Sequence, residues 1–251
     1  MVQQLLTILN NQQIIIMRIS AKEILSIIIL CLLPIMLNAQ VGESRNDFSV
    51  GINAGWTMSK MDFNPKIKQN MKGSPTFGLT TRYVCEKYFS TICAIQLELN
   101  YSQLGWKEFI EDGSGNTYTR SLNYIQLPML MQMGWGRENK GLKFLFEAGP
   151  QVGLYLNGEE EKGGGEWNTS NRPNNVTHQY GKEPANAFDY GITAGLGLEL
   201  STGIGHFMLV GRYYYGLGDI FDNSKKGYFG RSANQTIVAK LTYLFDLNRK
   251  N

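Results

Sequence analysis

The stretch SLNYIQLPMLMQMGWG, Ser121 to Gly136, decides the fold because its apolar residues recur at every second position. One face of this stretch carries no charge and consists of Ile125, Leu127, Met129, Met131, Met133 and Trp135. Alternation with period two predicts a β-strand whose two faces meet different surroundings. Pro128 falls on the opposite face, where its missing N–H forfeits one ladder hydrogen bond and indicates a bulge or kink.

The same alternation recurs in seven further segments, and helical periodicity is absent. Including the opening stretch, the segments span residues 48–57, 77–83, 95–102, 121–136, 142–156, 188–199, 206–215 and 234–245. After Leu37 no run of 18 apolar residues occurs, so the sequence predicts no membrane-spanning helix there. We therefore predict an all-β fold, an eight-stranded antiparallel up-and-down barrel.

The connections between these segments alternate between long and short. Those after the first, third, fifth and seventh segments are long and polar, and the longest covers residues 157–186. The connections after the second, fourth and sixth segments are short and consist of about EKYFS, GRENKG and STGIG. This asymmetry is typical of outer-membrane barrels, which have long loops outside the cell and tight turns in the periplasm. It predicts four long extracellular loops and two periplasmic chain ends.

Residue types indicate which face meets the membrane. A soluble lipocalin-like barrel would also alternate, with its apolar face inward. Here the aromatic residues of the apolar face collect near strand ends, as membrane-interface girdles do, and include Trp56, Tyr101, Trp135, Tyr190, Tyr213 and Phe245. We therefore predict that this face meets lipid, because a Lys or Arg at mid-bilayer costs about 2–4 kcal/mol in such barrels.

The polar face then lines the lumen and carries seven charged residues: Arg82, Glu98, Lys143, Glu147, Glu199, Arg212 and Lys240. An eight-stranded barrel is about filled by its own side chains. We expect these charges to pair off as a plug, because an unpartnered buried charge costs about 3–5 kcal/mol. A narrow, gated pore is the alternative.

Residues 1–39 are interpreted as an upstream segment, before Met17, followed by a secretory signal peptide. Arg18 and Lys22 precede a short apolar run that ends near Ala39, and this run is too short to anchor the chain. Residues 40–251 then form the barrel domain, with 22 basic and 20 acidic side chains, a balance that does not suggest nucleic acid. Cys85 and Cys93 could bridge a hairpin or be two small apolar residues, since export permits disulfides.

Candidate catalytic and metal-binding residues are sparse, so we predict no enzyme activity, cofactor or metal. Of the two histidines, His178 lies in the longest loop and His206 near a periplasmic turn, and no Gly-x-Ser-x-Gly elbow is present. The stretch EDGSGN, Glu111 to Asn116, imitates the start of a calcium loop. It lacks the required glycine and the twelfth-position acid, so we interpret it as a polar hairpin tip.

Several segments resemble the PorT-like outer-membrane β-barrel family of Gram-negative bacteria, over roughly residues 40–246. They are LELNYSQLGW (97–106), LNYIQLPMLMQ (122–132), FEAGPQVGLYL (146–156), FDYGITAGLGLEL (188–200) and RYYYGLGDIF (212–221). The resemblance implies an eight-stranded barrel, and the family's namesake takes part in protein export across the outer membrane. A shared fold does not transfer that role.

We therefore expect an integral outer-membrane protein of the cell envelope that binds or scaffolds through its loops. Its expected partners are outer-membrane lipid, lipopolysaccharide and an envelope or secretion protein. Loop 157–186, with Trp167, Tyr180 and the acidic residues Glu159 to Glu161, is the candidate contact surface. A long Gly-rich polar connection is as often mobile as functional, and we favour a solvated, mobile loop.

Overall fold

The computed structural model describes residues 47–88, 91–136, 141–170, 172, 176–223 and 227–247. The chain divides into two units, Met1–Ser44 and Arg45–Asn251, and all described residues belong to the second. The predicted upstream segment and signal peptide, residues 1–39, therefore lie outside the described residues.

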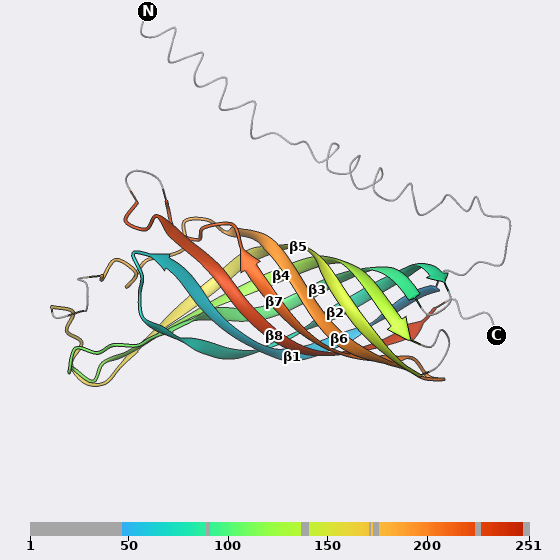
Figure 1. Ribbon diagram of the computed structural model, residues 1–251. Coiled ribbons are helices and arrows are strands. Elements are labelled where there is room, and N and C mark those ends of the chain that lie inside the picture. Colours follow the sequence, from blue (N-terminus) through green and yellow to red (C-terminus); the bar gives the residue numbers. More distant parts are fainter. Residues whose placement is uncertain are drawn as a thin grey trace, which may run out of the picture. The chain divides into compact units, whose positions relative to one another are not determined.

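The described residues form one closed barrel of eight antiparallel strands in up-and-down order (Figure 1). The strands are β1 (Asp47–Asn64), β2 (Gln69–Tyr88), β3 (Thr91–Glu108), β4 (Thr117–Gly136), β5 (Gly141–Gly163), β6 (Phe188–Ser201), β7 (His206–Gly216) and β8 (Arg231–Asp246). Each strand pairs with its neighbours in sequence, and β1 pairs with β8 to close the ring. The predicted fold class is confirmed. No helix capable of spanning a membrane occurs in this part of the chain.

The apolar face of the alternating pattern points outward and the polar face points inward. Leu99 is 50% exposed, whereas its neighbour Glu98 is 1% exposed. Pro128 is buried on the inner face of β4 and pairs with Gln151 of β5. The exposed apolar residues form a continuous band, here named the apolar belt, that spans residues 48–58 in β1 and 125–135 in β4. This length fits the roughly 9–11 residues that a strand needs to cross the hydrocarbon core.

Beyond the apolar belt, toward the longer connections, the strands continue and the polarity of their two faces reverses. In β1, Met61 and Phe63 point inward and are buried, while Lys60 and Asp62 lie on the outer face. In β4, Leu122 is buried and the outward Asn123 is polar. In β1 and β4 the order of inward and outward residues is unchanged, so only the chemistry of each face switches. In β5 a register shift opposite Asn123 and Tyr124 also changes which residues point inward, so that Gly153 and Glu160 are both on the inner face.

The strands are longer than the sequence segments predicted, and the loops are correspondingly shorter. The predicted long connection after β1 is reduced to residues 65–68, and β5 continues to Gly163, so Glu159 to Glu161 lie in a strand. The prediction of four long loops is therefore wrong for the first connection, residues 65–68, whereas the other three, residues 109–116, 164–187 and 217–230, are longer than any connection at the opposite end. The reversed polarity explains the error, because these polar stretches pack an apolar inner face.

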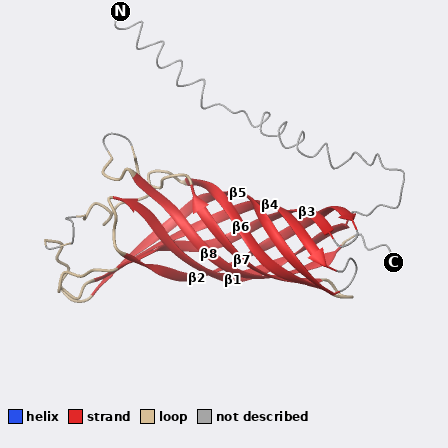
Figure 2. Ribbon diagram, viewed as in Figure 1, coloured by secondary structure: helices blue, strands red, loops and turns tan. Residues whose placement is uncertain are grey.

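The two ends of the barrel differ. One end, here named the turn end, carries the short connections 89–90, 137–140 and 202–205. Both chain ends of the barrel lie there, since Asp47 pairs with Val84 and Ser49 pairs with Asp246. The opposite end, the loop end, gathers the longer connections, drawn in tan in Figure 2.

Candidate functional site

All seven predicted lumenal charges are buried inside the barrel, where they form two clusters. The first surrounds Glu98 of β3. Arg212, from β7 on the far side, donates to its two oxygens at 2.8 and 2.6 Å, and Lys240 donates at 2.8 Å. Arg212 also donates through Nε to Glu147. One guanidinium thus ties two glutamates from different strands, and its fork geometry suits such pairing.

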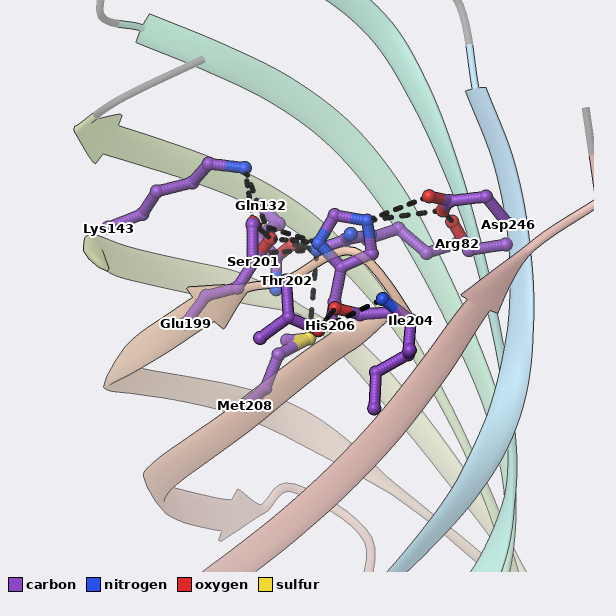
Figure 3. Close-up of polar contacts among 12 residues, drawn as sticks. Arg82, Gln132, Lys143, Glu199, Ser201, Thr202, Ile204, His206, Met208 and Asp246 are labelled. Atoms are coloured by element: carbon purple, nitrogen blue, oxygen red, sulfur yellow. Dashed lines mark hydrogen bonds and ion pairs between the residues drawn. The ribbon is translucent and has the colours of Figure 1, made fainter. Parts of the chain in front are cut away.

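The second cluster surrounds Glu199 of β6, close to the turn end (Figure 3). Arg82 donates to Glu199 at 2.6 Å and Lys143 at 3.2 Å. Gln132 connects the two clusters, because it lies 3.5 Å from Arg82 and donates to Glu147 at 3.2 Å. The seven residues therefore belong to one interior network that links opposite walls of the barrel.

His206 and Asp246 also belong to this network, and the sequence reasoning did not include them. The His206 Nδ1 atom lies 2.7 Å from Glu199, and Nε2 lies 3.1 Å from both oxygens of Asp246. Figure 3 shows the imidazole between these two carboxylates. Each ring nitrogen thus faces a carboxylate, and only the imidazolium form can donate from both nitrogens. His206 begins β7 directly after a short turn, and Asp246 ends β8, so their positions at strand ends are the signal that the sequence offers.

The same cluster brings a serine, a histidine and a carboxylate together. Ser201 Oγ lies 2.9 Å from His206 Nδ1. However, this oxygen also receives a hydrogen bond from Lys143 at 2.8 Å and donates to Glu199 at 2.8 Å, and Ser201 is 3% exposed. A nucleophile must be reachable by its substrate. In this arrangement the Ser201 hydroxyl is engaged and covered.

A small cavity of about 20 Å³ lies in the lumen and adjoins the Glu98 cluster, because Arg212 and Lys240 form part of its wall. Its lining consists of Thr76, Asn100, Ser102, Gln126, Pro128, Gln151, Thr193, Arg212, Tyr214, Thr236, Val238 and Lys240. A cavity of this size has room for about one water molecule. The Oδ1 atom of Asn100 and the hydroxyl of Thr236 are buried without a hydrogen-bond partner in the described part of the chain.

At the loop end the interior is filled by an apolar cluster, here named the loop-end core. It consists of Met61, Phe63, Leu104, Trp106, Tyr118, Leu122, Tyr124, Val176, Ile220, Phe221 and Phe229. The ring of Phe63 lies 5.1 Å from that of Trp106 and 5.0 Å from that of Phe229, at separations typical of packed aromatic pairs. Because Val176, Phe221 and Phe229 come from the connections, these segments pack into the mouth of the barrel.

The β5–β6 connection is held to the barrel by a buried arginine. Arg172 forms an ion pair with Asp112, donates to Asn116 at 3.1 Å and to the Tyr180 hydroxyl at 3.1 Å, and stacks on Trp167 at 4.7 Å. Burial raises the pKa of the Tyr180 hydroxyl, and the nearby Glu108 carboxylate raises it further. Asp112 of the calcium-like stretch therefore serves as an ion-pair partner in this structure.

These contacts overturn the expectation of a solvated loop over residues 157–186. Glu160 points inward and accepts hydrogen bonds from Arg120 at 2.8 Å and from the Tyr118 hydroxyl at 2.8 Å. Trp167 and Tyr180, two residues of the predicted contact surface, pack against the loop-end core. The physical reason is that the strand extensions offer an apolar interior, which the connection covers.

The six predicted interface aromatics all point outward. Trp56, Tyr101, Tyr190 and Tyr213 lie on the loop-end side of the apolar belt, and Trp135 and Phe245 lie on the turn-end side. Neighbouring rings meet at both rims: Tyr101 lies 5.4 Å from Phe77, and Trp135 lies 6.3 Å from Phe144. Cys85 and Cys93 are exposed and not bridged.

A comparison with protein families matches residues 38–222 to a family model described as "Outer membrane protein beta-barrel domain". Among curated proteins no match is found.

Solved structures that resemble the chain share little sequence with it. Ail, the attachment invasion locus protein of Yersinia pestis, is 11% identical, with coverage of 79% of this chain and 99% of that chain and a TM-score of 0.35. The outer membrane enzyme PagL is 12% identical, with coverage of 78% and 98% and a TM-score of 0.38. OprG from Pseudomonas aeruginosa is 10% identical, with coverage of 80% and 93% and a TM-score of 0.38. At these values the likenesses carry no inference about function.

Proposed function

The chain belongs to the outer membrane protein beta-barrel domain family, and from this premise we propose that it is a binding protein of the outer membrane rather than an open pore. In this proposal the loop end faces the cell exterior, both chain ends face the periplasm, and the protein is not an enzyme. Its lipid partners are the acyl chains and lipopolysaccharide of the outer membrane.

The observation that carries the proposal is the loop-end core. Eleven buried residues from strands and connections fill the mouth of the barrel, and beneath them the ion-pair network fills the lumen. An aqueous channel needs a hydrated path, which an interior filled by side chains does not leave. A rigid, closed outer end suits recognition, because preorganised surfaces lose less entropy on binding.

The exposed aromatic residues of the connections supply a contact surface for an envelope protein. Phe109 is 47% exposed in the β3–β4 connection. Tyr228 is exposed in the β7–β8 connection, and its ring stacks on that of His178 at 3.8 Å. Large aromatic side chains often dominate binding energy at protein interfaces. Phe109 and Tyr228 therefore take the place of Trp167 and Tyr180 as the proposed contact residues, because Trp167 and Tyr180 pack against the loop-end core.

Cross-linking in native outer membranes tests the proposal. Wild-type protein should yield one or a few fixed partners, and the double variant Phe109→Ala, Tyr228→Ala should lose them while keeping the barrel fold. Ile204→Ala is the matched control, because Ile204 is exposed at the turn end and should not affect a partner of the loop end. Equal partner yield from the double variant would refute this contact surface.

A small gated pore is the second candidate function, and the polar cavity with its unpartnered atoms favours it. Opening would require the ion pairs of Arg212 and Glu98 to separate. Single-channel recording in planar bilayers distinguishes the two candidates. The binding proposal expects no stepwise conductance from the wild-type protein, whereas discrete openings would support the pore.

The orientation and the PorT-like assignment are also proposals. The Asn-Tyr-Ile-Gln-Leu-Pro sequence, Asn123 to Pro128, supports placement with PorT-like barrels, including the possibility of a role in secretion. In a background without Cys85 and Cys93, Ser114→Cys should react with a membrane-impermeant maleimide on intact cells, and Ile204→Cys should not. The reverse labelling pattern would invert the topology.

A further inference from the structure

Cys85 and Cys93 lie on the outer surface of the β2–β3 hairpin, close to the turn end of the barrel. They are the only cysteines in the described part of the chain. Their inward neighbours Val84 and Ala94 are 4% and 5% exposed, whereas both cysteines are exposed. Because side chains alternate between the two faces of a strand, both thiols point away from the lumen.

A β-bulge sets the two cysteines opposite each other. In the β2–β3 ladder Val84 pairs with Ala94, and the next pair is Glu86 with Cys93. Cys85 is therefore an extra residue between two successive pairs of the ladder. In a bulge, two residues of one strand oppose one residue of the other. Cys93 is thus the residue of β3 that Cys85 faces.

The Cys85 thiol reaches toward β3 and is held weakly. It interacts with Cys93 and with the backbone of Ile95, the next outward residue of β3. Its hydrogen bond to the backbone carbonyl of Tyr83 is 3.8 Å long, and a thiol is a weak donor. Neither cysteine is packed into the barrel interior, so rotation about the Cα–Cβ bonds is enough to turn the two sulfur atoms toward each other.

The spacing of the strands and the cellular compartment both suit a disulfide. Directly opposed residues of an antiparallel ladder have Cα atoms about 4.5–5.5 Å apart, within the range of about 4.4–6.8 Å that a disulfide spans. A member of an outer-membrane family passes through the bacterial periplasm, where disulfides form and persist. Two exposed thiols that face each other there are open to oxidation.

We propose that Cys85 and Cys93 are joined in the cell envelope by a disulfide, formed by a thiol–disulfide oxidoreductase. One cysteine thiolate attacks the disulfide of the oxidoreductase and forms a mixed disulfide, which the other thiolate then attacks. One S–S bond forms in the barrel and one breaks in the oxidoreductase. The two electrons reduce the oxidoreductase to a dithiol, which takes up the two protons that the cysteines release.

The disulfide would fix the position of the bulge in β2. The residues of β2 beyond the bulge are assigned to the lumen or to the apolar belt by the register with β3. A slip of one residue would move side chains such as Arg82 from the lumen to the outer face. A covalent link at Cys85 prevents the bulge from moving along the strand.

Peptide mapping of the full-length protein from native outer membranes tests the link. Membranes are collected in N-ethylmaleimide, which blocks free thiols before digestion. Trypsin cleaves after Lys87, between the two cysteines. Cys85 then lies in peptide 83–87 and Cys93 in peptide 88–107. We expect the two peptides as one linked species that dithiothreitol separates.

Two mapping results would overturn the proposal. One is recovery of both peptides as N-ethylmaleimide adducts without prior reduction. The other is a disulfide that joins two copies of the chain, which a non-reducing gel shows as a covalent dimer. The single variants Cys85→Ser and Cys93→Ser are controls for the labelling, because each leaves one thiol that N-ethylmaleimide should modify completely.

Thermal unfolding in detergent measures what the link contributes to stability. A disulfide restricts the unfolded chain, so the oxidised wild-type protein should melt several degrees above the reduced protein. The double variant Cys85→Ser, Cys93→Ser is the matched control and should melt like the reduced protein, with or without dithiothreitol. Equal melting temperatures of the oxidised and reduced wild type would refute the role in fixing the hairpin. Neither measurement involves a partner at the loop end, so this proposal and the binding function can fail separately.

Discussion

Near the turn end the barrel interior is held by ion pairs such as Glu98 with Arg212, whereas near the loop end it is filled by Phe63, Trp106 and their neighbours. The outer surfaces differ in the opposite sense, with the apolar belt around the ion pairs and polar side chains around the loop-end core. Hydrocarbon outside removes the advantage of burying apolar groups inside, whereas water restores it. The medium around each half thus accounts for the chemistry of its interior.

The largest loss of stability should follow from removing the positive charge of Arg212, which lies in the half of the barrel interior that is held by ion pairs. Arg212→Met leaves Glu98 and Glu147 buried without their shared partner. We expect a loss of about 3–5 kcal/mol in the free energy of unfolding, measured by denaturant titration in detergent. A loss no larger than that of an exposed pair would show that the network is dispensable.

A cavity in the loop-end core should lower the free energy of unfolding by nearly as much, and its effect on hydrogen exchange should be confined to the loop end. Leu104→Ala removes a fully buried side chain, for an expected loss of about 2–5 kcal/mol. We expect faster hydrogen exchange in the connections 109–116 and 217–230, while the strands within the apolar belt keep their protection. Uniform loss of protection would mean that the two halves unfold as one unit.

Lysine scanning along β4 locates the boundary between the halves. Met131→Lys places a charge in the apolar belt and should cost about 2–4 kcal/mol if this region meets lipid, measured by reversible unfolding in liposomes. Asn123→Lys, beyond the belt, is the matched control and should cost about 0–1 kcal/mol. Similar costs at both positions would contradict the assigned boundary.

The smallest effect concerns an exposed ion pair. Lys68 pairs with Glu111, and these side chains are 65% and 48% exposed. Lys68→Met should change the free energy of unfolding by less than about 1 kcal/mol, because solvent screens exposed pairs. The contrast with Arg212→Met measures what burial adds to an ion pair. A loss of more than about 2 kcal/mol would mean that the exposed pair organises the β3–β4 connection.

Sequence periodicity predicted the strands of the apolar belt well and the strand extensions poorly. Residues 58–64 keep the same alternation, with Met61 and Phe63 on the inner face. Here, however, the inner face is apolar and the outer face is polar, which is the reverse of the arrangement in the apolar belt. The polar outer residues of this stretch indicate a loop when only the lipid-facing pattern is considered, although they belong to a strand whose outer face meets water. Leu104 and Trp106 of β3 are also apolar residues on the inner face, two positions apart, so the sequence contains the same reversed pattern there.

Other parts of the site depend on distances that no pattern contains. His206 and Asp246 meet because the register of β7 and β8 sets His206 opposite Leu244. Arg172 reaches Asp112 and Asn116, 60 and 56 residues away, only after the connection folds over the barrel. Neither contact follows from local propensity.

The sequence by itself determined the eight strands, the apolar outer face and the charged lumen, because a period of two assigns each side chain to one face wherever the medium differs across the wall. Only the tertiary structure decided which charges pair and that the polar connections close the mouth. These outcomes depend on closure of the barrel and on its register, which bring residues from opposite walls within a few ångströms of each other.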